Sequence, residues 1–132
     1  MSRSDYSYEL DNWSHIRYRG AVNSAAKGKR GQQFFKELLL ALDAMQEKKL
    51  IAHELESSGQ FCAIGVLGNA RKIDMSKIDP NDIGQVSNEF DIAQALAREV
   101  VFTNDEDCLT SETPDKRWIR MRRWVDAQIV AV

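Results

Sequence analysis

The side chains best suited to contact a charged ligand lie in a short basic turn, Lys27-Gly28-Lys29-Arg30-Gly31. The 132-residue chain has a formal net charge of −2, yet residues 12–36 contain no acidic residue. The same stretch contains six basic residues: Arg17, Arg19, Lys27, Lys29, Arg30 and Lys36. A turn of this kind could hold an anion, because N–H groups at a helix start point outward and arginine makes bidentate contacts to carboxylate or phosphate. The alternative is a solvated turn between two helices.

A second basic set lies near the C-terminus, where Lys116, Arg120 and Arg123 share one stripe of an expected helix. A solvated outer helix face is the alternative interpretation of this set. The neighbouring Trp124 would act as a protein-interface anchor if it is exposed, since tryptophan and arginine are enriched at interface hot spots.

Motifs for a reaction or a metal are incomplete. The Walker pattern requires Ser or Thr where the chain has Arg30, and the zinc pattern H-E-x-x-H has Ser57 in place of its second histidine. Residues 105–107 lack the glycine and glutamate of a calcium loop, so an exposed acidic turn is expected there. We therefore expect no catalytic residue, no metal and no cofactor, while a catalytic site assembled from distant residues stays open.

Four helices and one hairpin are expected to position these residues. The first helix runs from Trp13 to about Lys27, and the second follows Gly31 with apolar residues at helical spacing that make it the spine of the core (Phe34, Phe35, Leu38, Leu39, Leu42 and Met45). A third begins at Asp79-Pro80, with a break near Asn88. The last begins at Thr113-Pro114 and places Trp118, Met121, Val125 and Ile129 on one stripe.

The expected hairpin joins residues 50–56 to residues 60–67 through Ser57-Ser58-Gly59. Its second arm is an almost continuous apolar run and is the best strand candidate, whereas the first arm could instead extend the preceding helix. The fold class predicted is α+β, a mainly helical domain of about four helices with one β-hairpin.

Composition predicts one globular domain over residues 12–132, preceded by a flexible segment, residues 1–11, that ends where Trp13 docks. Two isolated cysteines, Cys62 and Cys108, favour reduced thiols and a reducing cytoplasm. No export signal and no apolar run long enough to span a membrane is present, so no membrane partner is expected. Oligomeric state is not predicted.

The two helices around the turn also suggest a helix-turn-helix DNA-binding unit. Their composition argues against it, because the second helix is rich in Phe and Leu and has few donors for base edges. Specific DNA recognition is therefore not the favoured function.

Several short runs resemble an uncharacterised family of small proteins encoded by bacteriophages and prophages. They are Asp11-Asn12-Trp13, residues 16–22, Gly28-Lys29-Arg30-Gly31-Gln32, Glu37-Leu38-Leu39, Leu50-Ile51, residues 65–68, Asp74-Met75 and Glu112-Thr113-Pro114. The resemblance implies a phage-linked role in a bacterial cytoplasm and supplies no catalytic residue.

The favoured hypothesis is a non-enzymatic protein that binds a host or phage protein and modulates or inhibits a bacterial system such as antiviral defence. Its partner-binding residues would be Arg17, Arg19, Lys27, Lys29 and Arg30, with Lys116, Arg120 and Arg123 second. The alternative is a nucleic-acid-binding protein that uses the same basic turn.

Overall fold

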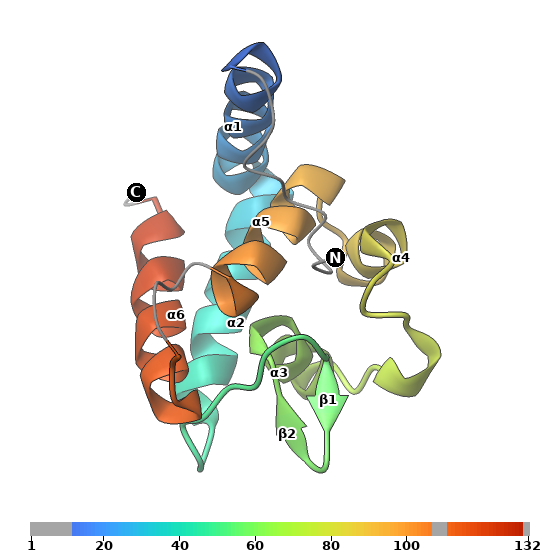
Figure 1. Cartoon of the computed structure of the whole chain (residues 1–132), viewed down its shortest axis with the longest axis vertical. Helices are drawn as coiled ribbons and strands as arrows, with labels where there is room; N and C mark the ends of the chain where they lie inside the picture. The colour runs from blue at the N-terminus through green and yellow to red at the C-terminus, as the bar shows by residue number, and fades with distance from the viewer. Residues whose placement is uncertain (1–11, 107–110, 131–132) are drawn as a thin grey trace.

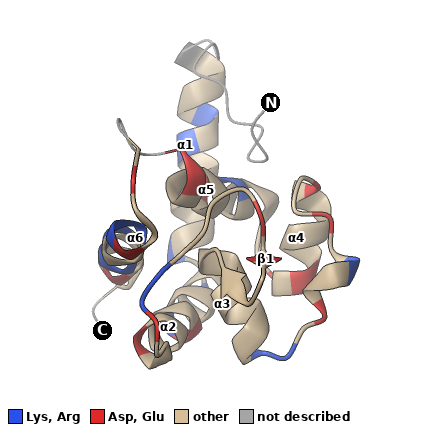
Figure 2. Ribbon diagram, turned by 60° about the horizontal axis from the view of Figure 1, so that its bottom comes forward, with Lys and Arg blue, Asp and Glu red and all other residues tan. Residues whose placement is uncertain are grey.

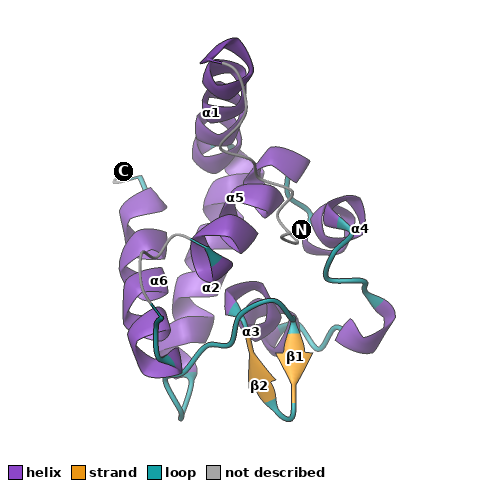
Figure 3. Cartoon of the chain, viewed as in Figure 1, coloured by secondary structure: helices purple, strands orange, loops and turns teal. Residues whose placement is uncertain are grey.

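The computed structural model describes residues 12–106 and 111–130, and within them the chain is mainly helical with one small hairpin (Figures 1 and 3). The described residues form six α-helices, one 3₁₀ helix and two antiparallel strands. The predicted α+β, mainly helical class is confirmed, whereas the expected number of about four helices is wrong. The predicted flexible segment 1–11 and Cys108 lie outside the described residues.

The elements are, in chain order, α1 (Asn12–Lys27), α2 (Lys29–Ala44), β1 (Glu56–Ser57), β2 (Gln60–Phe61), α3 (Ala63–Ala70), η1 (Met75–Lys77), α4 (Ile83–Phe90), α5 (Gln94–Asp105) and α6 (Pro114–Gln128). Figure 1 shows α1 and α2 following one another along the long axis, with α6 beside α2. The first turns of α1 extend beyond the other described elements (Figures 1 and 2).

Helix α2 is the spine of the core, as its apolar spacing predicts. Phe34, Phe35, Leu38 and Leu42 are buried, and α2 packs against both α3 and α6. From α6, Trp118, Met121 and Val125 are buried as predicted, and Trp118 Nε1 donates a hydrogen bond of 3.2 Å to the carbonyl of Leu42. That bond satisfies one of the carbonyls that the last turn of a helix leaves open.

The predicted strand over residues 60–67 is wrong beyond Phe61, because α3 begins at Ala63. Residues 63–68 are buried all round, and a continuous apolar run does not distinguish a buried strand from a buried helix. Cys62 caps α3, since its Sγ accepts a hydrogen bond of 3.4 Å from the Gly65 amide. Gly65 is required by packing: a Cβ there would lie 1.9 Å from the carbonyl oxygen of Leu55.

The hairpin turn occurs where it is predicted, but its strands are only two residues long. Glu56 pairs with Phe61 and Ser57 with Gln60, and Ser58 and Gly59 both adopt positive φ. The preceding residues 50–55 neither extend α2, which ends at Ala44, nor form a strand. They are held by backbone bonds, including Leu50 N–H to Pro114 O at 3.0 Å.

The expected helix from Asp79-Pro80 is two helices. Asp82 caps the first, with its Oδ1 accepting from the Gln85 amide at 3.1 Å. The break falls at residues 91–93 rather than near Asn88, because Asp91 takes a left-handed conformation (φ 53°) and ends α4. The predicted start of the last helix is confirmed, since Thr113 caps α6.

A buried polar junction at Asn104 and Asp105 replaces the first part of the exposed acidic turn predicted there, while Asp107 lies outside the described residues. Asn104 is 1% exposed; its Oδ1 accepts from the Ala63 amide at 3.1 Å and its Nδ2 donates to the Ile51 carbonyl at 3.0 Å. The Asp105 side chain is fully buried and accepts from the His53 amide at 3.0 Å. Asn104 and Asp105 therefore hold residues 50–55, the irregular segment before the hairpin, in place through hydrogen bonds to its backbone.

Candidate functional site

The basic turn is a tight junction between α1 and α2. Gly28 caps α2 in an extended conformation without a side-chain hydrogen bond, and Lys27 and Lys29 beside it are exposed. Gly31 is buried against α1, where a Cβ would lie 1.9 Å from the carbonyl oxygen of Ala25. A glycine at this position therefore sets how closely the two helices approach.

Arg30 reaches from the turn to the end of α4. Its Nη1 lies 3.2 Å from Asp91 Oδ1, and both side chains are well exposed. Exposed ion pairs of this kind contribute little to stability. A partner carboxylate could therefore replace Asp91 at Arg30 at small cost.

A hollow of about 430 Å³ opens beside the turn, between α2 and the ends of α3 and α4 (Lys29, Arg30, Gln33, Phe34, Glu37, Arg71, Phe90 and Asp91). Arg71 is fixed in it by a two-pronged contact to Glu37, with Nε to Oε1 at 3.2 Å and Nη2 to Oε2 at 2.8 Å. The hydrogen bond from Arg71 lowers the pKa of Glu37. The hollow thus presents both signs of charge, a surface suited to a protein partner.

Arg17 and Arg19 lie on different sides of α1. Arg17 is exposed, whereas Arg19 forms an ion pair with Glu99 of α5. Tyr18 donates to the same carboxylate at 3.3 Å, and its burial together with that carboxylate raises the pKa of Tyr18. Arg19 therefore holds α1 against α5, and Arg17 is the arginine of this pair that faces outward.

The C-terminal candidates are divided in the same way. Arg120 binds Glu112 through Nε at 2.7 Å and Nη2 at 2.9 Å, and also donates to the carbonyls of Thr103 and Asn104 at the end of α5. Lys116 and Arg123 are exposed. Arg120 thus caps α5, which gives it a structural role inside the domain.

The two basic segments are only partly brought together. Helices α2 and α6 run antiparallel, so that Gln32 Nε2 donates to the Gln128 carbonyl at 2.9 Å beside the turn. Lys116 precedes Gln128 by twelve residues, or about 18 Å along the helix, and lies at the far end. Among the predicted residues, Lys27, Lys29 and Arg30 therefore form the compact group.

Two exposed apolar side chains on α1 were missed by the sequence interpretation. Trp13, expected to dock, is 67% exposed, and Ile16 is 59% exposed. Helical spacing could have predicted this exposure. It places Trp13 and Ile16 on the side of α1 opposite to Val22 and Ala26, which are buried. Trp124, the candidate interface anchor of α6, is partly buried and meets Phe35 edge to face with ring centroids 5.6 Å apart.

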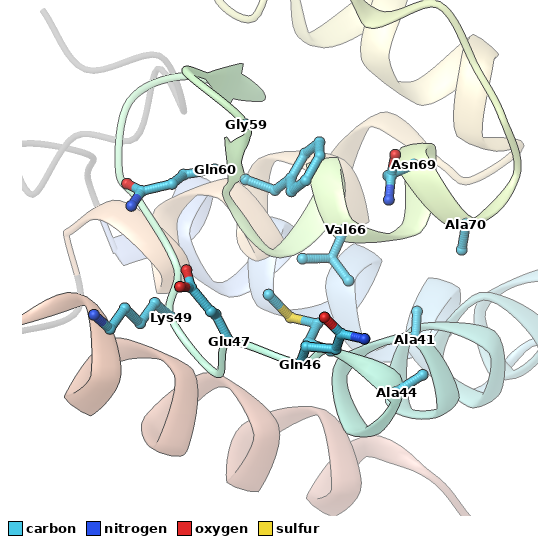
Figure 4. Close-up of a pocket in the computed structure, with 12 residues that line it drawn as sticks. Ala41, Ala44, Gln46, Glu47, Lys49, Gly59, Gln60, Val66, Asn69 and Ala70 are labelled. Carbon is cyan, nitrogen blue, oxygen red and sulfur yellow. The ribbon is translucent and has the colours of Figure 1, made fainter.

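A larger hollow of about 520 Å³ lies between the end of α2, the hairpin and α3 (Figure 4). Its floor is apolar, with Met45, Phe61 and Val66, and its rim carries amide side chains. Glu47 and Lys49 are the titratable residues that line it. Within the described part of the chain, no group of three His, Cys, Asp or Glu side chains is placed to hold a metal ion.

Comparisons with known proteins give no match, whether with family models, with curated proteins or with solved structures. The resemblance to phage proteins therefore stays a prediction. None of the described helices is long and apolar enough to cross a membrane.

Proposed function

We propose that this chain is a small non-enzymatic accessory protein of a bacteriophage or prophage. It binds a host or phage protein in the bacterial cytoplasm and thereby modulates or inhibits a bacterial system such as antiviral defence. The contact is made by the basic turn and the exposed residues that continue from it along α1.

The observation that carries this proposal is the separation of charge. Figure 2 shows Lys and Arg but no Asp or Glu along α1, in a chain whose formal net charge is −2. Arg17, Lys27 and Lys29 are exposed, and no carboxylate among the described residues forms an ion pair with them. Such a patch steers association with an acidic protein surface and contributes specificity.

Nucleic acid is the alternative partner, favoured by two lysines beside the N-terminus of α2, which no side chain caps. Two features support a protein instead. Glu37 and Asp91 lie in the hollow beside the turn, where they would repel phosphates, and α2 is rich in Phe and Leu, with few donors for base edges.

The test is recovery of partners from bacterial lysate on the immobilised chain, with and without nuclease, followed by mass spectrometry. We expect a stoichiometric protein that survives nuclease and is lost with Lys27→Glu/Lys29→Glu, but retained with the matched surface reversals Lys72→Glu/Lys77→Glu. Recovery that depends on nucleic acid, with affinity falling steeply with salt, would assign the turn to nucleic acid instead.

A further inference from the structure

One side of α1 carries two large exposed apolar residues, Trp13 and Ile16, that no described element covers. Trp13, Ile16, Arg17, Gly20, Ser24 and Lys27 follow spacings of three and four residues and are all exposed. We call these six residues the outer α1 face. Exposed tryptophan next to exposed isoleucine is a feature of protein-binding surfaces, because both lose contact with water only when a partner covers them.

Gly20 lies in the middle of this face, and the fold does not need it. A Cβ at Gly20 would meet no atom within 4 Å, whereas Gly31 is crowded by Ala25. Glycine inside a helix weakens that helix relative to alanine. What Gly20 does offer is an uncovered stretch of backbone that another helix could approach closely, as small residues do at helix–helix contacts.

The charges on the outer α1 face indicate the chemistry of its partner. Arg17 lies beside the apolar pair and Lys27 at the far end, and α1 carries no carboxylate. A partner must therefore supply both an apolar stripe and acidic groups. A second copy of this chain fits poorly, because pairing two α1 helices would bring arginine and lysine against their own kind.

We propose that the outer α1 face docks an amphipathic helix of another protein, whose apolar stripe is flanked by Glu or Asp. Trp13 and Ile16 anchor the apolar stripe, Gly20 allows the two helices to pack closely, and Arg17 binds a carboxylate through its guanidinium. The first turns of α1 extend beyond the other described elements, so a second helix can lie along them without meeting those elements (Figure 1). This inference rests on the proposed function and names the class of partner.

The probe is a capped synthetic helix of roughly 18 residues, a length at which isolated helices begin to form, with Leu at helical spacing and Glu on both flanks. Two control peptides have the same Leu stripe with Lys in place of Glu, or the Leu/Glu composition in scrambled order. Binding is measured by calorimetry, and also by tryptophan emission, because Trp13 is exposed while Trp118 is buried.

We expect the Leu/Glu peptide to bind saturably and to shift the emission to shorter wavelength. Trp13→Ala and Arg17→Glu should each weaken binding by about tenfold or more, as truncation of an interface anchor does. Gly20→Gln should also weaken it, by placing a long side chain in the contact. Leu40→Ala is the matched control, because Leu40 is 72% exposed on α2 and away from this face; it should change affinity less than twofold.

The proposal is overturned if the Leu/Glu peptide shows no saturable binding below about 1 mM, or if either control peptide binds equally well. Retained binding by Trp13→Ala, with an unchanged circular dichroism melt, would also overturn it. A concentration-dependent dimer that Trp13→Ala abolishes would show that a second copy covers the face instead. If lysate capture responds to Lys27→Glu/Lys29→Glu but not to Trp13→Ala, the proposed function survives and this inference fails.

Discussion

Arg19 and Glu99 form an ion pair that joins α1 to α5, with the Glu99 side chain 8% exposed and the Arg19 side chain 42% exposed. Arg19 is thus one of the six basic residues between positions 12 and 36, and its role is to stabilise the packing of α1 on α5. The opposite side of α1 is not covered by any described element. It also accounts for the orientation of the helix, because Tyr18 and Arg19 both reach the same carboxylate.

Glu99→Gln should lower the free energy of unfolding by about 1–2 kcal/mol, because it removes the charge that pairs with Arg19 while keeping the side-chain volume. The partial exposure of Arg19 keeps the effect below that of a fully buried pair. Urea unfolding measures the change. Glu89→Gln, at an exposed position of α4, should stay within about 0.5 kcal/mol of the wild type, and an equal loss there would contradict the role given to Glu99.

Tyr18 should make the protein lose stability in alkaline solution. Burial, then the nearby Glu99 carboxylate, raises the pKa of Tyr18 above its ordinary value of 10.0. Above pH 10 the unfolded chain releases the phenolic proton while the folded chain keeps it, so stability falls as pH rises. Unfolding free energies compared between pH 9 and 11 should show a smaller decline for Tyr18→Phe; an equal decline would assign the effect to other groups.

Glu112 should confer sensitivity to acid. The hydrogen bond from Arg120 holds the pKa of Glu112 below its ordinary value of 4.5. Its contribution to stability is therefore present above pH 4.5 and is lost as pH falls through the lowered pKa. Urea unfolding between pH 3 and 7 should show that Glu112→Gln is less stable than the wild type at pH 7 and that the difference narrows in acid. A constant difference would show that packing, not charge, is responsible.

Gly31→Ala and Gly20→Ala should have opposite effects although both glycines are inside helices. At Gly31 the new methyl would lie 1.9 Å from the Ala25 carbonyl oxygen, and forcing α1 and α2 apart should cost about 1–3 kcal/mol. At Gly20 the methyl meets nothing within 4 Å, so the better helix former should add about 0.5–1 kcal/mol. Thermal unfolding of the two variants gives the sign directly.

Lys29→Glu should separate binding from stability. Lys29 is the first residue of α2, whose first turn contains no acidic residue. A carboxylate there interacts favourably with the helix dipole and should add about 0.3–1 kcal/mol, while partner binding through the turn weakens. A destabilised variant would leave any loss of binding without a specific cause, so the melt is measured beside the affinity.

The sequence predicts those parts of this fold that depend on local patterns. The buried residues of α2 recur with the period of a helix, and Thr113-Pro114 is a typical N-cap and first residue that indicates the start of α6. Helix α3 could not be predicted, because residues 63–68 are all buried and their apolar run has the same appearance in a buried strand. The division of the third predicted helix depends on Asp91 adopting a left-handed conformation, which residue type alone does not specify.

The candidate site is half visible in the sequence. The run of basic residues can be read directly, but the carboxylate that binds Arg19 lies 80 residues away, and Arg120 is held partly by carbonyls of another helix. Sequence spacing therefore could not separate the basic residues that hold the fold from those that face outward. The exposure of Trp13 ran against expectation because large aromatic residues usually contribute to a core.

Gln32 brings the far end of the chain to the basic turn, since its Nε2 donates to the Gln128 carbonyl at 2.9 Å and its Oε1 accepts from the Val130 amide at 2.9 Å. Asn12 begins α1 beside Trp13. An affinity handle or fluorescent label fused beyond either of these ends would therefore crowd the basic turn or the outer α1 face. The Ser58–Gly59 turn, at the opposite end of the molecule in Figure 1, is the better attachment point for immobilising the protein.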